Sequence, residues 1–543
     1  MNLCEKLSPA PGLLIRNARL LTQNPDQPRA SILVSKGQEI IYVGDELDQA
    51  RKGLADGGLE IDLEGRNVIP GLTDGHAHLI GEGEKLARLD LHGLDFQETL
   101  EAVRREAARR NKGEWILGLG WNQERWPGGH WPHCRDLDQV SPDNPVALDR
   151  MDKHSIWVNS LALKLGGLTP ATSNPPGGEY LLDERGELQG ILVGNGMWAV
   201  MDAMPSEGRE GLLKALLRAQ DEMFSYGITS VMDAGVTMDS LEVMERAYAA
   251  GRLKLRVRGM MLAFNQSDAA YLAAGKGAVR GLYGERFSIE GVKIHSDGSL
   301  GSRSAWLSQD YADRPGHRGG HSYSDDELYA LMKRADDHGL IISIHAIGDA
   351  AVHQALAGMK KVFGAETGDR RWRIEHFQVV QPEDLDQALA LKIIPSIQTV
   401  GLMNDLHMAE DRLGPQLIER SYLWREVLER GGLLVNGADG PVESVNPYEG
   451  LYAAVSRRDL NGNPPGGWRP QDKLSRSEAL STYTTWAAYS EFNENRKGKL
   501  QPGYLADLAV IDRDYLNCPE DEIKNINCLM TVLGGEVVYQ KRD

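Results

Sequence analysis

The chain contains eight short apolar runs rich in β-branched residues, and helical periodicity separates several of them. They are residues 68–76, 227–235, 255–262, 288–295, 340–345, 372–376, 392–398 and 433–439. Residues 209–224 and 325–335 show the intervening helical spacing. Apolar strands that alternate with helices are typical of parallel βα units. Eight such units are the number needed to close a TIM barrel, so the sequence predicts an α/β fold of the (β/α)8 class.

Both ends of the chain carry shorter strand-like runs. They are residues 13–20, 31–44 and 59–63 near the start, and 507–512 and 531–539 near the end. Neither set is large enough to form a stable sheet alone. We therefore expect the termini to meet in one small β-sandwich domain, residues 1–66 and 497–543, beside a barrel domain at 67–496.

A long segment separates the first two predicted barrel strands. It covers about residues 80–205, far more than an ordinary βα connection. It contains its own strand-like run, residues 115–121, and three clustered tryptophans, Trp121, Trp126 and Trp131. We expect an inserted subdomain over the barrel mouth.

Composition excludes several kinds of partner. Lys and Arg total 60 against 78 Asp and Glu, a net charge of −18, which argues against a nucleic-acid or anionic membrane surface. The four cysteines lack C-x-x-C spacing, so reduced thiols in a cytoplasmic protein are expected. Neither a signal-type apolar segment nor a window of ~18 apolar residues occurs. We expect a small-molecule substrate and no nucleic acid or membrane; a homodimer stays open.

Residues that bind metals or transfer protons collect at the ends of five predicted strands. They are His76 and His78, Lys293, His345, His376 and Asp439. In a TIM barrel these strand ends converge on one mouth. His76 and His78, two positions apart on a strand, would share a face and could bind one metal ion.

Each of these residues also has a purely structural interpretation. His345 and His376 could be hydrogen-bonded core histidines, with Glu375 orienting a neighbour, and Asp439 could be an ordinary turn residue. Lys293, between apolar residues of a buried strand, must be paired or chemically altered. Together the pattern predicts a metal site.

Motifs along nearly the whole chain carry a family resemblance. They are Pro70-Gly-Leu-Thr-Asp-Gly-His-Ala-His, Gly227-Ile-Thr-Ser-Val, Gly291-Val-Lys-Ile-His-Ser-Asp-Gly-Ser-Leu-Gly-Ser, His345-Ala-Ile-Gly-Asp, Ile374-Glu-His, Pro395-Ser-Ile-Gln, Gly437-Ala-Asp-Gly-Pro and Leu500-Gln-Pro-Gly-Tyr-Leu-Ala-Asp-Leu. The chain resembles the amidohydrolase superfamily, in particular the family 3 branch of N-substituted formamide deformylases and related metal-dependent hydrolases. One departure is Gln398-Thr-Val, where similar proteins usually continue into Pro and often His, so no strand-seven contact is assigned.

The resemblance implies a metal centre and a reaction. The ligands would be His76, His78, His345, His376 and Asp439, with Lys293 where many members carry a carboxylated lysine bridging two metals. Such donors suit zinc best. The reaction implied is hydrolysis of a C–N amide-type bond, in an N-substituted formamide or related N-acyl amine, by metal-activated hydroxide with Asp439 as general acid and base.

Two other functions remain open. The first is a one-metal aminohydrolase that deaminates a heterocycle, with Lys293 as an ion-pair residue. The second is a non-catalytic barrel scaffold. Such a protein should lack some of the metal ligands, and here every expected ligand is present.

Substrate contacts are less constrained by the sequence. Candidates are Trp121, Trp126 and His154 in the insertion and Arg303 beyond the fourth strand. The tryptophans would suit an aromatic substrate group, although tryptophan also fills cores, and Arg303 would bind a carboxylate or a helix end.

Overall fold

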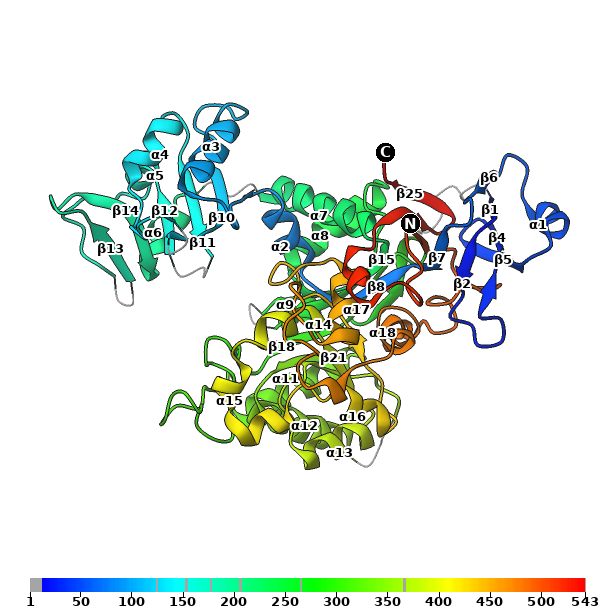
Figure 1. The fold of residues 1–543 in the computed structure, drawn as a ribbon. Coiled ribbons are helices and arrows are strands. Elements are labelled where there is room, and N and C mark those ends of the chain that lie inside the picture. The colour runs from blue at the N-terminus through cyan, green and yellow to red at the C-terminus, as the bar shows by residue number, and fades with distance from the viewer. Residues whose placement is uncertain are drawn as a thin grey trace. The chain divides into compact units, whose positions relative to one another are not determined.

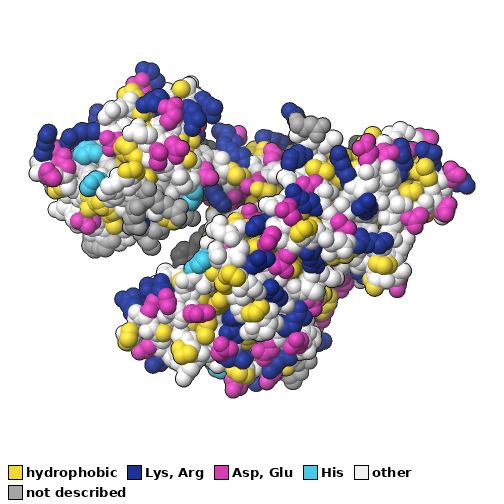
Figure 2. All heavy atoms as spheres, viewed as in Figure 1, with side chains coloured by type: hydrophobic (Ala, Val, Ile, Leu, Met, Phe, Trp, Pro, Cys, Tyr) yellow, Lys and Arg dark blue, Asp and Glu magenta, His cyan; other side chains and the backbone are white. Residues whose placement is uncertain are grey.

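The computed structural model describes residues 12–123, 126–151, 155–175, 178–204, 208–263, 266–364 and 368–542. The chain divides into two compact units (Figure 1). One is Met1–Ile80 with Leu216–Asp543, and the other is Gly81–Ala215. In the described part of the chain, no helix has the length and apolar character to cross a membrane. On the face in Figure 2, Lys and Arg are interspersed with Asp and Glu.

The larger unit contains the predicted barrel. Its parallel strands, in spatial order, are β8 (Leu72–Ala77), β15 (Ile228–Val236), β16 (Arg256–Leu262), β18 (Phe287–His295), β19 (Ile341–Ala346), β20 (Arg373–His376), β21 (Ile394–Ile397) and β22 (Val435–Asn436). Nearly all their residues are buried, as expected for strands covered on both faces. Beyond β22, the Asp439 N–H donates to the His76 carbonyl at 2.7 Å, and the His78 N–H donates to Gly440 at 2.8 Å. These bonds bring the first and last strands together, so the (β/α)8 prediction is confirmed.

Helices connect the barrel strands. The two predicted helices are α7 (Gly208–Ser225) and α11 (Asp325–Asp337). The start of α11 is fixed by a capping box, in which Ser324 and Glu327 satisfy each other's backbone N–H groups. Further helices are α8 (Met238–Ala249), α12 (Asp349–Phe363), α13 (Pro382–Ala390), α14 (Thr399–Asp405), α16 (Trp424–Glu429) and α17 (Pro447–Ser456).

Strands from both ends of the chain form two sheets of a sandwich, dark blue and red in Figure 1. The first has the order β5 (Glu39–Gly44), β4 (Ile32–Lys36), β1 (Leu13–Arg16), β6 (Leu59–Asp62). The second has the order β25 (Glu536–Gln540), β24 (Cys528–Leu533), β23 (Leu508–Ile511), β7 (Asn67–Pro70), β2 (Arg19–Leu21), β3 (Arg29–Ala30). One apolar core joins them, with Leu13 and Leu33 from the first sheet and Val68 and Val510 from the second.

One strand prediction is wrong in detail. Residues 68–76 are two strands in different sheets, because β7 belongs to the sandwich and β8 to the barrel. The break falls at Gly71, where a Cβ atom would lie 2.4 Å from Thr229 Oγ1, so only glycine permits this approach. Residues 531–539 likewise form parts of a hairpin, β24 and β25, that turns at Gly534 and Gly535.

The second unit, Gly81–Ala215, is the large insertion after the first barrel strand. Its six-stranded sheet has the order β13 (Gly178–Leu182), β14 (Leu188–Gly194), β12 (Ser155–Val158), β11 (Val146–Arg150), β10 (Ile116–Trp121), β9 (Leu89–Asp90). Helices α3 (Phe96–Ala107), α4 (Cys134–Val140) and α5 (Ser160–Leu165) accompany it. Trp121, Trp126 and Trp157 share one hydrophobic core, so the unit has its own interior.

Candidate metal centre

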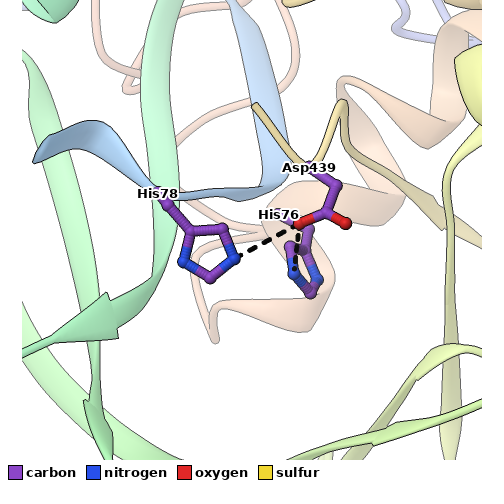
Figure 3. Close-up of side chains that lie close together, drawn as sticks. All are labelled: His76, His78 and Asp439. Carbon is purple, nitrogen blue, oxygen red and sulfur yellow. Dashed lines mark ion pairs between the residues drawn. The ribbon is translucent and has the colours of Figure 1, made fainter. Parts of the chain in front are cut away.

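His76 and His78 lie at the end of β8, where both rings approach Asp439 (Figure 3). The Asp439 Oδ1 atom is 3.3 Å from His76 Nε2 and 3.2 Å from His78 Nε2. Possible ligand atoms of these three residues all lie within 4.8 Å of one another. Asp439 follows β22, so barrel closure brings this group together.

Glu375 determines how His76 faces the group. Its Oε2 atom lies 2.5 Å from His76 Nδ1, which leaves Nε2 directed at Asp439. Glu375 also accepts hydrogen bonds from Ser343 and Arg373. Burial raises the Glu375 pKa, but Arg373 and His76 outweigh it and hold the pKa well below its ordinary value. A fixed carboxylate behind a histidine ligand is the usual support of a metal site.

The charges around His76 favour a cation. Burial and Lys293 lower the pKa of His76, yet the carboxylates of Glu375 and Asp439 outweigh them and raise it. Burial also raises the Asp439 pKa, but His76 and His78 hold it well below the ordinary value. Two ionised carboxylates with imidazole nitrogens between them fit a divalent metal, which would take the place of a proton.

The remaining predicted ligands reach the same place from neighbouring strands. Lys293 Nζ, on β18, is 3.2 Å from His76 Nε2. The ring of His376 is 5.5 Å from that of His76 and 4.4 Å from that of His345, measured between centroids. The structure thus places Lys293, His345 and His376 around the group of His76, His78 and Asp439, and their binding of a metal stays a prediction.

Lys293 is a deeply buried lysine beside the His-His-Asp group. Its exposed fraction is 1%, and burial lowers its pKa although Glu375 and Asp439 oppose the shift. Among the described residues, no carboxylate lies within ion-pair distance of its amine. Burial thus favours the neutral form of the amine, which is the form that can be chemically altered.

A cavity of about 360 Å³ opens beside these residues. Its lining includes His78, Lys293, His345, His376 and Asp439, together with His295, Ser299, Leu300, Gly301, Ile347, Gln378, Ile397, Gln398, Gly401, Asp405, Tyr422, Trp424, Val442 and Glu443. Acidic, amide and aromatic side chains from several loops therefore surround the metal group.

His295 is a lining residue that the sequence reasoning missed. Within the described chain its Nδ1 atom is buried without a hydrogen-bond partner, and its ring lies 5.5 Å from that of His345. Burial and the neighbouring Lys293 lower its pKa to about 2. The signal was present, because Lys293 and His295 are two positions apart on one strand, as are His76 and His78.

Comparison with known proteins agrees with this geometry. A sequence model described as "Amidohydrolase family" matches residues 59–539. The chain belongs to the amidohydrolase family. It is therefore a hydrolase, and the His-His-Asp group fits the divalent metal of metal-dependent relatives.

Individual relatives of this amidohydrolase have varied names. The Arabidopsis thaliana protein LONG AFTER FAR-RED 3 is 33% identical over 97% of this chain and 91% of its own. An N-substituted formamide deformylase of Arthrobacter pascens is 27% identical over 97% of this chain and 98% of its own. The structure of an uncharacterized metal-dependent hydrolase from Pyrococcus furiosus is 28% identical, with a TM-score of 0.77, covering 93% of this chain and 100% of that one.

The residues proposed to contact substrate have other partners in the amidohydrolase. Trp121 is fully buried in the inserted unit and donates its indole N–H to Leu148 at 2.8 Å. Trp126 donates to Leu94 at 3.0 Å and also lines a groove of about 400 Å³ in that unit. Core filling accounts for Trp121. His154 lies outside the described residues.

Arg303 likewise has a structural partner. Its guanidinium makes a two-pronged ion pair with Asp313, at 3.0 and 2.8 Å, and it does not line the cavity beside the metal group. Gln398 does line that cavity, and its amide donates to the Ser396 carbonyl at 3.3 Å. A carboxylate of the substrate would have to compete with Asp313 for Arg303.

Proposed function

We propose that this amidohydrolase hydrolyses the C–N bond of an N-substituted formamide or a related N-acyl amine. The observation that carries the proposal is Asp439, a carboxylate that lines a cavity of small-molecule size and is held 3.2–3.3 Å from two imidazole nitrogens. The likeness to an N-substituted formamide deformylase over nearly the full length supports the substrate class.

The proposed cofactor is a pair of zinc ions. His76, His78, His345, His376 and Asp439 would hold them, together with a carboxylated Lys293. Imidazole and carboxylate donors suit zinc, and the buried amine of Lys293 can take up carbon dioxide when it is neutral. A divalent metal, when bound, supplies a Lewis acid that acidifies water and polarises a carbonyl group.

Asp439 moves the proton in the proposed reaction. His76 and His78 keep its pKa low, so its carboxylate starts ionised and can accept a proton from water as the water oxygen attacks the carbonyl carbon. The same proton then passes to the departing nitrogen as the C–N bond breaks. Water and amide are consumed, and a carboxylic acid and an amine are formed. Glu375 keeps His76 in place during these steps.

The test is a product analysis with the zinc-loaded protein. A panel of N-formyl and N-acyl amines, with amino-substituted heterocycles beside it, is incubated and analysed by mass spectrometry. We expect an acid and a free amine in equal amounts from at least one amide. Release of ammonia from a heterocycle, with every amide left intact, would contradict the proposal and favour the one-metal aminohydrolase.

A further inference from the structure

Asp405 is a carboxylate of the cavity that metal binding does not use. It ends α14 and lines the cavity on the side formed by Gln378, Tyr422 and Trp424. Its Oδ2 atom accepts hydrogen bonds from Gln378 Nε2 and from the Tyr422 hydroxyl, both at 2.8 Å. In the described chain its Oδ1 atom accepts none, so one carboxylate oxygen is left for a ligand.

The charge of Asp405 has no counterion in the described protein. Both of its hydrogen-bond donors are neutral, and no Lys, Arg or His of the described residues lies within ion-pair distance. Burial raises its pKa to about 6, although Tyr422 and Gln378 oppose the shift. The group is therefore mainly ionised at neutral pH. A partly buried carboxylate without a cation is unfavourable, and a cationic ligand would relieve that cost.

The surroundings hold Asp405 in a fixed position. The Tyr422 N–H donates to the Gln378 carbonyl at 2.9 Å, which ties the segment before α16 to the segment after β20. Tyr422 has a φ of +54°, a conformation that non-glycine residues seldom adopt. Glu443 adds a second carboxylate to the same cavity, and Leu300 and Ile397 supply apolar wall. This part of the cavity is acidic and pre-organised, with room for an alkyl or aryl chain.

We propose that Asp405 selects substrates that carry a positively charged group in addition to the scissile amide, such as amine-terminated N-acyl amines. The inference rests on the proposed function in taking this cavity as the active site. Asp405 would bind the ammonium group through a charge-assisted hydrogen bond, while the amide faces Asp439.

A pair of probes that differ only in charge tests the proposal without turnover. N-(5-aminopentyl)methanesulfonamide carries an ammonium group where N-hexylmethanesulfonamide has a methyl group, and neither contains a hydrolysable amide. Titration calorimetry with the metal-loaded full chain should show the ammonium probe binding about ten- to a hundredfold more tightly, as expected for one hydrogen bond to a charged group. Equal binding of both probes, or binding of neither, would overturn the proposal.

Two variants locate the effect. Asp405→Asn keeps the shape and removes the charge, so the preference should fall to about unity. Asp411→Asn is the matched control, because Asp411 is exposed on the following helix and does not line the cavity. A preference that survives in Asp405→Asn would also overturn the proposal. The wild-type comparison stands even if a variant fails to fold.

The binding experiment and the product analysis of the amide panel together separate the two proposals. If the ammonium probe binds preferentially and Asp405→Asn abolishes that preference, but no amide is cleaved, the selectivity stands and the proposed reaction is wrong. If amides are cleaved with no preference for charge, the reaction stands and the role of Asp405 is wrong.

Discussion

His76 contacts three side chains of different chemistry, and these contacts define its role. Glu375 faces Nδ1, while Lys293 and Asp439 face Nε2 at 3.2 and 3.3 Å. A neutral imidazole whose Nδ1–H is donated to a carboxylate presents its Nε2 lone pair to a metal. The orientation of His76 therefore depends on Glu375, which does not line the cavity.

Glu375→Gln should weaken metal binding while leaving the ligands in place. We expect a loss of about 10- to 100-fold in affinity, the usual effect of removing such a supporting carboxylate. Competition with a chromogenic chelator measures it. Glu290→Gln is the control, since Glu290 is as buried as Glu375 but pairs with Arg258 instead of a ligand. Equal losses in both variants would show a general effect of barrel stability.

The residue types at strand ends were enough to predict which side chains assemble. His76, His345, His376 and Asp439 are far apart in sequence, and only barrel topology relates them. The roles of Glu375 and His295 were harder to predict from the sequence. Each role depends on the direction in which the side chain points and on the side chains that it contacts. Trp121 shows the converse, since an aromatic residue in an insertion looks the same whether it fills a core or faces a ligand.

The eight barrel strands were predicted within a few residues because their apolar runs are strong. The division of residues 67–77 between β7 and β8 could not be predicted in this way. Nearly every residue of both strands is buried, so the pattern of apolar residues does not change at Gly71. What separates them is a tertiary contact, the approach of Gly71 to Thr229. Sequence periodicity carries no record of such a contact.

The junction between sandwich and barrel contains a buried ion pair. Arg256, at the start of β16, contacts Asp507, which precedes β23, at 2.7 and 2.9 Å. Asp507 also accepts a hydrogen bond from the Gly534 N–H at 2.7 Å. Burial raises the Asp507 pKa, but Arg256 outweighs it and lowers the pKa below its ordinary value. Its ionised form therefore stabilises the fold.

Asp507→Asn should cost about 3–5 kcal/mol of unfolding free energy at pH 7, because Arg256 is left buried without its partner. Since the folded pKa of Asp507 is depressed, its contribution is complete above the unfolded pKa of about 3.9 and is lost as pH falls through the folded value. Urea unfolding from pH 7 down to pH 3 should show the difference between Asp507→Asn and wild type beginning to narrow below about pH 3.9. Asp56→Asn, at an exposed site, should follow wild type throughout. A constant difference between Asp507→Asn and wild type would contradict this account.

At the scale of the whole molecule, the chain holds two units with separate cores. The metal group and its cavity are built only from residues of the larger unit. The insertion has its own sheet and its own tryptophan-rich core. Ligand binding should therefore stabilise one unit directly and leave the other unchanged.

Calorimetry should reveal this division. Zinc should raise the transition temperature of the larger unit, because a ligand that binds only the folded state stabilises that state by mass action. Trp121→Ala should lower the free energy of unfolding of the insertion by about 3–5 kcal/mol, and with it the transition temperature of that unit. The zinc content should not change. Trp198→Ala is the matched control, because that side chain is 55% exposed in the same unit. A single transition that both changes move would contradict two independent units.

Metal titration of the full chain shows whether zinc and Asp439 are both required for amide hydrolysis. Metal-free protein is titrated with zinc while cleavage of an N-formyl amine is followed. We predict negligible turnover without metal, a rise that saturates at two zinc ions per chain, and a loss of about 10²- to 10⁴-fold for Asp439→Asn at the same zinc content. Equal rates with and without zinc, or in wild type and Asp439→Asn, would contradict the account.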